Sequence, residues 1–239
     1  MHEIKKQNHI VIQLNFFGPF LEKIDLPKIL NPKTKEGTKE DLDKSLLNSF
    51  FDLPVELLSK EILERYIEIT TRETHTSIVP HTERLFERLL KPLRSAKKNY
   101  CLGEYSATIA LCGTVAEMLA LLVWEINDIR LKGEQIGRKE EEGIFGKTFD
   151  DLVHARRLKI LETFGFITGD QFKKFENIRK KRNSYLHSWS VDLSNEKQEA
   201  LDLFKNIFQL FMEITEIGLA DAGTVKINPK ILKLFKDVE

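Results

Sequence analysis

Apolar residues recur at steps of three and four along most of the chain, which is the spacing typical of amphipathic helices. Leucine and phenylalanine form such a stripe in residues 81–98, where Pro92 predicts a kink or a new helix start. A helix entered at Pro54 is expected to run to about residue 71. Other helices are predicted at residues 38–51, 104–132, 148–164, 171–187 and 195–217. Thr148 with Asp151, and Thr168 with Gln171, match capping boxes at the start of two of them. This pattern predicts an all-α protein.

The segments between these helices have other patterns. Residues 9–17 are rich in β-branched side chains and alternate loosely, so we expect a short strand or an extended arm. Residues 133–147 hold four glycines and a run of charges, which favours a solvated loop. Short connections favour antiparallel neighbours. We therefore expect an antiparallel helical bundle of four to five long helices at residues 81–217, an α-rich N-terminal extension at 1–80, and a tail at 218–239.

Composition narrows the function classes. The 37 Lys and Arg residues balance the 37 Asp and Glu residues, which argues against a DNA-packing protein or a polybasic membrane protein. On one continuous helix the two cysteines, Cys101 and Cys112, would lie about 16 Å apart, and a disulfide needs Cα atoms within about 7 Å. Free thiols fit a reducing compartment. The N-terminal residues do not have the pattern of a secretory signal, so we expect a cytoplasmic protein.

Residues 105–123 are apolar over about the thickness of a membrane. Glu117 lies in the middle of this segment, and a carboxylate at the bilayer centre costs roughly 2.5–3.5 kcal/mol. A helix that is apolar all round is also typical of the centre of a soluble bundle. We expect the second arrangement, with no membrane contact, and we expect Glu117 to face a polar partner inside the bundle, with Arg182 matching it in charge.

Common catalytic fingerprints are absent from the sequence. There is no GxxxxGK[ST], no GxGxxG after a strand, no CxxC and no HExxH. His75 and His81 flank a proline without the spacing of a metal site, and His154 is expected at the surface or in a groove beside two arginines. We therefore expect no metal and no cofactor.

The segment NIRKKRNSYLHSW, residues 177–189, is the strongest functional signal. Arg182 falls on the apolar stripe of its helix, where a buried charge needs a partner. Asn183 and His187 share a face, whereas Arg182 and His187 point about 140° apart on an unbroken helix. The two side chains can converge if the helix ends near His187, or if two copies of the segment meet across a dimer axis.

The residue types in this segment suit RNA chemistry. Histidine exchanges protons near neutral pH, and arginine stabilises charge on a phosphoryl group. Basic neighbours suit a polyanion, and the candidate RNA-binding residues are Lys174, Arg179, Lys180 and Lys181. RNA carries its own nucleophile, the 2′-hydroxyl, so histidine and arginine can cleave it without a metal. The alternative is structural, with Arg182 and His187 bonding helix ends and the lysines forming a solvated face.

The run Arg182-Asn183-Ser184-Tyr185-Leu186-His187 resembles the motif of HEPN domains, in which four to six residues, the first of them usually polar, separate an arginine from a histidine; here four do. The preceding apolar helix with its acidic residue, the loop and the next helix also resemble that family, over about residues 81–217. Residues 1–80 are outside the resemblance.

The resemblance implies a HEPN-like helical bundle that forms a homodimer and acts as a metal-independent endoribonuclease, in toxin–antitoxin systems or antiviral defence against phage. It implies catalytic roles for Arg182 and His187, a positioning role for Asn183, and an acidic catalytic residue for which Glu117 is the candidate. An equal alternative is that Glu117 has a structural role and forms an ion pair with Arg182. The resemblance also implies RNA and a cognate antitoxin or regulatory protein as partners. Some HEPN members are non-catalytic, so the alternative is an interaction module that binds a protein partner or a nucleotide.

Overall fold

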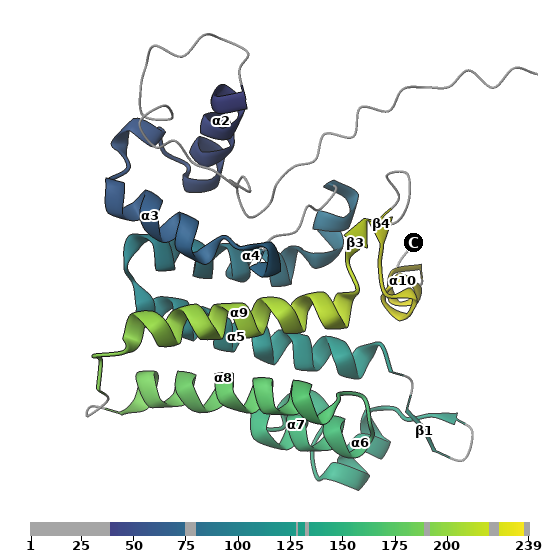
Figure 1. The fold of residues 1–239 in the computed structure, drawn as a ribbon. Coiled ribbons are helices and arrows are strands. Elements are labelled where there is room, and N and C mark those ends of the chain that lie inside the picture. The colour runs from purple at the N-terminus through teal and green to yellow at the C-terminus, as the bar shows by residue number, and fades with distance from the viewer. Residues whose placement is uncertain are drawn as a thin grey trace, which may run out of the picture.

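The computed structural model describes residues 39–74, 80–127, 129–131, 134–188, 192–219 and 225–236. The described chain is mostly helical, which confirms the all-α prediction (Figure 1). Its only described strands are two-residue pairs, β1 (Arg130–Leu131) with β2 (Glu134–Gln135) and β3 (Gly218–Leu219) with β4 (Val225–Lys226). The strand or arm expected at residues 9–17 lies outside the described residues.

The α-helices are α2 (Lys39–Phe51), α3 (Lys60–Ile69), α4 (Pro80–Leu102), α5 (Tyr105–Glu125), α6 (Arg138–Phe145), α7 (His154–Thr163), α8 (Gly169–His187), α9 (Glu196–Thr215) and α10 (Pro229–Lys236). Within the described residues, three short 3₁₀ turns lie between some of these helices, namely η1 (Val55–Leu57), η2 (Arg72–Thr74) and η3 (Phe149–Asp151).

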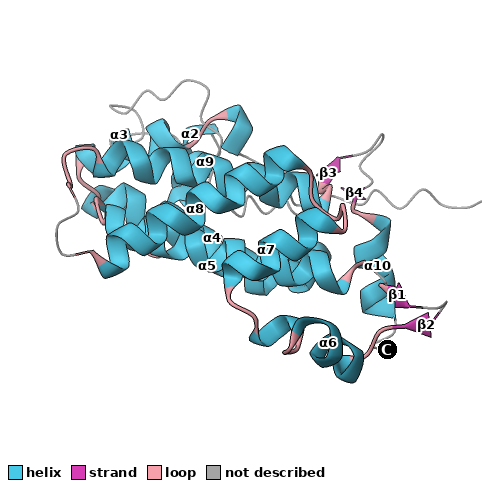
Figure 2. Ribbon diagram, turned by 90° about the horizontal axis from the view of Figure 1, so that it is seen from below, coloured by secondary structure: helices cyan, strands magenta, loops and turns pink. Residues whose placement is uncertain are grey.

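Helix α5 is the centre of the bundle. It packs against α4, α8 and α9 and, over a shorter length, against α7. Figures 1 and 2 show α8 and α9 side by side, with α7 and α6 on the outer side of α8 and with α3 against α4 at the opposite edge. Helix α5 is long and apolar enough to cross a membrane by length and composition, and half of its most apolar window is buried inside the protein. That burial fits a core helix, as the sequence predicted.

One apolar core runs through all these layers. It includes Phe50 of α2 and Tyr66 of α3 as well as the buried faces of α4, α5 and α9. An amine lies inside it, because Lys97 of α4 is fully buried with its Nζ 4.4 Å from the ring centre of Tyr66 and 5.5 Å from that of Phe50. The described part of the N-terminal extension thus shares a core with the bundle, and the proposed boundary at residue 80 stays a prediction.

Several predicted helix boundaries are wrong. Helix α4 continues through Pro92 to Leu102 without a new start. The central helix ends at Glu125 and not near residue 132, because the Asn127 side chain donates to the Val123 carbonyl and closes the last turn. The helix entered at Pro54 is a 3₁₀ turn followed by α3, whose first turn is capped by the hydroxyl of Ser59.

The segment 133–147 contains helix α6, so its prediction as a loop is wrong. The Glu140 carboxylate accepts the backbone N–H of Gly137 and starts the helix. Glu141 accepts one hydrogen bond from the indole of Trp124 at 3.0 Å and one from the backbone N–H of Phe149 at 2.9 Å. These contacts tie a highly charged helix to the core, which a composition rule cannot detect.

Helix α7 starts later than predicted. The Thr148 hydroxyl donates to the Asp151 carboxylate, so the expected capping box forms only a 3₁₀ turn, and α7 begins at His154. The capping box of Thr168 and Gln171 is confirmed, since each side chain bonds the backbone of the other residue. That box fixes the start of α8, which carries the Arg182–His187 segment.

Candidate functional site

Arg182 of α8 and Glu117 of α5 form an ion pair, with 3.1 Å between Arg182 Nη1 and Glu117 Oε1. The aliphatic part of Arg182 crosses α5 at Gly113, where an added Cβ would lie 2.6 Å from Cγ of the arginine. Real Cβ atoms do not approach so closely, so a residue without a side chain is needed where the two helices meet. The pairing expected from the sequence is therefore confirmed, and Gly113 makes room for it.

The pair is partly open to solvent. The side chain of Arg182 is 29% exposed and that of Glu117 is 36% exposed. Glu117 therefore faces the predicted partner, but the prediction that this partner contact lies inside the bundle is wrong. The carboxylate lies at the edge of the α5–α8 contact. A solvated guanidinium with a fixed carboxylate neighbour can contact a ligand that arrives from water.

His187 is the last residue of α8, and its side chain is exposed. The next backbone N–H, that of Ser188, still bonds the Ser184 carbonyl at 3.0 Å, so the helical geometry is regular to the end. Within one chain, Arg182 and His187 therefore keep their divergence of about 140°. Asn183, which is partly buried, lies on the same side of the helix as His187. The helix does end at His187, but that ending does not turn the histidine toward Arg182.

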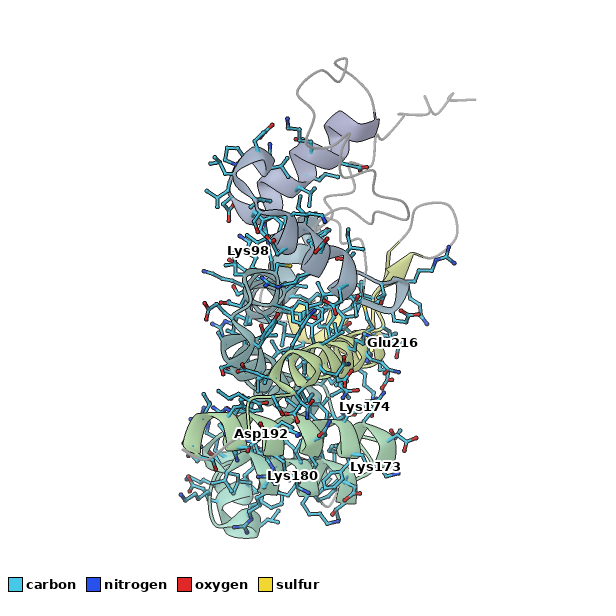
Figure 3. All side chains as sticks on the ribbon, turned by 60° about the vertical axis from the view of Figure 1, so that its left-hand side comes forward. Lys98, Lys173, Lys174, Lys180, Asp192 and Glu216 are labelled. Atoms are coloured by element: carbon cyan, nitrogen blue, oxygen red, sulfur yellow. The ribbon has the colours of Figure 1, made fainter. Side chains whose placement is uncertain are left out.

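The four candidate RNA-binding residues all belong to α8, and three have close acidic partners. Lys174 contacts Glu213 at 2.8 Å, Arg179 makes two hydrogen bonds to Glu176, and Lys181 pairs with Glu199. Lys180 differs, since its side chain is 70% exposed and lies 3.9 Å from Glu176. Figure 3 shows Lys173, Lys174 and Lys180 together along α8, far from Lys98 of α4. The four residues lie on different sides of α8 and form no single face, and a polyanion would compete with a close carboxylate at Lys174, Arg179 and Lys181.

The sequence missed the position of His154. Both of its ring nitrogens are shielded from solvent and have no hydrogen-bond partner among the described protein groups. Burial, followed by the charges of Arg157 and Arg179 and least of all by that of Arg182, lowers the pKa of His154 to about 4, and Glu176 partly opposes this effect. The prediction that His154 lies at the surface or in a groove is therefore wrong for its two ring nitrogens, which are shielded from solvent. No spacing signal revealed this, because the break before α7 was not predicted.

The two cysteines are free and buried, as predicted, but they lie in two helices, α4 and α5, and not on one continuous helix. Burial raises the pKa of Cys101 to about 12 and raises that of Cys112 as well. A thiol that stays protonated is a poor nucleophile. Neither cysteine is a candidate catalytic residue.

A scan of the chain against protein-family models, curated proteins and solved structures found no match to any of the three. The candidate site therefore rests on the geometry of Arg182, Glu117, Asn183 and His187.

Proposed function

We propose that this protein is a metal-independent endoribonuclease of HEPN type, in which Arg182 and His187 act on the phosphodiester and Asn183 and Glu117 position the reacting groups. The observation that carries the proposal is the partly solvated ion pair of Arg182 with Glu117, on the helix that ends at His187. An arginine held by a carboxylate at the edge of a bundle keeps donors available for a phosphate.

The chemistry follows from the residue types. The RNA 2′-hydroxyl attacks the adjacent phosphorus, the bond to the 5′ oxygen breaks, and a 2′,3′-cyclic phosphate forms. His187 takes the proton of the 2′-hydroxyl as the new bond to phosphorus forms, a water molecule gives a proton to the leaving 5′ oxygen, and the protonated histidine then returns its proton to solvent. The guanidinium of Arg182 stabilises the charge that develops on the non-bridging oxygens.

The proposed enzyme is a homodimer. Because Arg182 and His187 diverge within one chain, the arginine of one protomer and the histidine of its partner would together form each reactive site. Light scattering should give twice the chain mass of 27.8 kDa. In this proposal the protein acts in the cytoplasm, in toxin–antitoxin or antiviral defence, where an antitoxin would restrain it.

A second function has one observation in its favour. Lys174, Arg179 and Lys181 are occupied by internal ion pairs, so these three basic residues are less available to RNA than the sequence suggests. This favours a non-catalytic HEPN-like module that binds a protein partner or a nucleotide.

Cleavage of single-stranded RNA separates the two functions. His187→Ala and Arg182→Ala should each reduce the rate about 10²–10⁴-fold, and cleavage should persist in EDTA. Lys233→Ala, an exposed change on α10, is the matched control and should leave the rate unchanged. Product ends are identified as 2′,3′-cyclic phosphates by mass spectrometry. Equal rates for the wild type and both site variants would leave the binding module as the function.

A further inference from the structure

Two neighbouring helices carry complementary polar atoms without partners. Nε of Arg182 on α8 and both ring nitrogens of His154 on α7 are shielded from solvent, and no described protein group bonds them. A buried donor or acceptor left unsatisfied costs about 1–3 kcal/mol. Such groups in native proteins therefore call for a physical explanation.

The placement of the two residues brings them to one side of α8. The His154 ring packs edge-on against Phe175, with 6.4 Å between ring centres. Arg179 and Arg182 follow Phe175 by four and seven residues, so all three lie on the same side of the helix. Long side chains on a helix lean toward its N-terminus, which carries the Arg182 side chain toward His154. The charge of Arg182 also acts on the imidazole.

Three guanidiniums lie near His154, and only one has a free Nε–H. Nε of Arg157 donates to the Phe149 carbonyl at 3.1 Å, and Nε of Arg179 donates to Glu176 at 2.8 Å. Arg182 uses Nη1 for Glu117, and its Nε remains without a partner among the described groups.

The protonation state of His154 determines whether its ring can accept a hydrogen bond. The charged groups that act on the ring are Arg157, Arg179 and Arg182, opposed by Glu176, and with burial they keep the imidazole neutral at pH 7. A neutral imidazole has one nitrogen that accepts a hydrogen bond. A buried water typically makes about three hydrogen bonds to polar groups that would otherwise be unsatisfied.

We propose that His154 is a positioning residue for Arg182: the Nε–H of the guanidinium donates to one buried water, the water donates to the imidazole nitrogen, and this bridge holds Arg182 toward Glu117. Arg182 would then be fixed on both sides, by Glu117 of α5 and by His154 of α7. The effect on RNA cleavage rests on the proposed ribonuclease function, whereas the contact itself does not.

Nitrogen-15 NMR of the arginine Nε–H groups tests the contact directly, with Arg182→Lys assigning the signal. In the wild type the Arg182 Nε–H should exchange with water at least tenfold more slowly than that of an exposed arginine such as Arg156. His154→Phe keeps a ring but removes the acceptor, and it should shift the Arg182 signal and speed its exchange. His154→Gln restores an acceptor and should bring the Arg182 signal and its exchange rate back toward the wild type. The Nε–H of Arg179, which donates to Glu176, is the internal control and should be unchanged.

Fast exchange of the Arg182 Nε–H in the wild type would overturn the proposal without any variant. An unchanged Arg182 signal in folded His154→Phe would overturn it as well. In RNA cleavage we expect about a tenfold loss of kcat for His154→Phe at unchanged KM, and recovery with His154→Gln. If the wild type does not cleave RNA but the NMR contact is present, the ribonuclease proposal fails and the positioning role of His154 stands.

Discussion

Gly113 of α5 lies directly beneath the side chain of Arg182 of α8, so close that a Cβ at residue 113 would be 2.6 Å from Cγ, 3.0 Å from Cδ and 3.1 Å from Cβ of the arginine. These atoms belong to the base of the arginine side chain, which cannot move away without moving the helix or changing rotamer. The position of the candidate catalytic guanidinium therefore depends on the absence of a side chain at residue 113.

Gly113→Ala should destabilise the protein although alanine is the better helix former. Helix propensity alone favours alanine by about 1 kcal/mol, while forcing an extra methyl into a packed contact costs about 1–3 kcal/mol. Gly143 in α6 is the matched control, because nothing lies within 4 Å of a Cβ added there. Urea unfolding of both variants measures the difference. Equal stabilisation by the two substitutions would show that the α5–α8 contact is looser than described.

Breaking the Glu117–Arg182 pair should cost little stability. Loss of one partner from a fully buried pair costs about 3–5 kcal/mol, but exposed pairs are typically worth about 0.2–1 kcal/mol. With exposures of 36% and 29%, Glu117→Gln should lower the free energy of unfolding by about 1 kcal/mol or less. The same variant should reduce RNA cleavage strongly, since the guanidinium loses its fixed neighbour. A loss near 4 kcal/mol in chemical unfolding would instead assign the pair a structural role.

Buried Lys97 should make stability increase with pH just above neutrality. Burial lowers its pKa to about 7 in the folded state, against about 10.4 in the unfolded chain. Between these values the unfolded state binds more protons, so the free energy of unfolding rises with pH by up to about 1.4 kcal/mol per unit.

Other buried groups limit the window in which this rise is visible. The raised pKa values of Cys101 and Cys112 act in the opposite direction above about pH 8.5, where unfolded thiols ionise. The increase should therefore be clearest between about pH 7 and 8.5, and Lys97→Met should remove it. Unfolding curves at several pH values for both proteins provide the measurement, and parallel pH profiles would contradict the burial of a neutral amine.

The sequence predicted the helices with strong apolar periodicity well, because burial of one face determines both the pattern and the fold. Helices α4 and α9 were found for this reason, whereas α5 was found as a long uninterrupted apolar run and α8 from its sparser apolar stripe and the capping box of Thr168 and Gln171. Helix α6 was missed, since it is held by the Glu141 contacts to Trp124 and Phe149, which come from other segments.

In the candidate site, too, some features could be predicted from local sequence and others depend on packing between distant segments. The charge match of Glu117 and Arg182 could be predicted, because Glu117 stands out on an apolar helix and Arg182 falls on the apolar stripe of a charged one. The solvation of that pair, the role of Gly113 and the burial of the His154 nitrogens depend on how α5, α7 and α8 pack together, and no local pattern encodes them. The ion pairs of Lys174 and Lys181 with α9 are likewise contacts between distant segments.

The central claim is a ribonuclease site built from two chains, and mixing two inactive variants tests it most directly. Arg182→Ala and His187→Ala are each purified, confirmed as folded dimers, and then mixed, unfolded and refolded together so that the chains exchange. A mixed dimer pairs the intact arginine of one chain with the intact histidine of the other in one of its two sites, so cleavage should return to about a quarter of the wild-type rate. A wild type that cleaves RNA alongside a mixture that stays inactive would contradict the shared site, and a wild type that forms no 2′,3′-cyclic phosphate would contradict the ribonuclease itself.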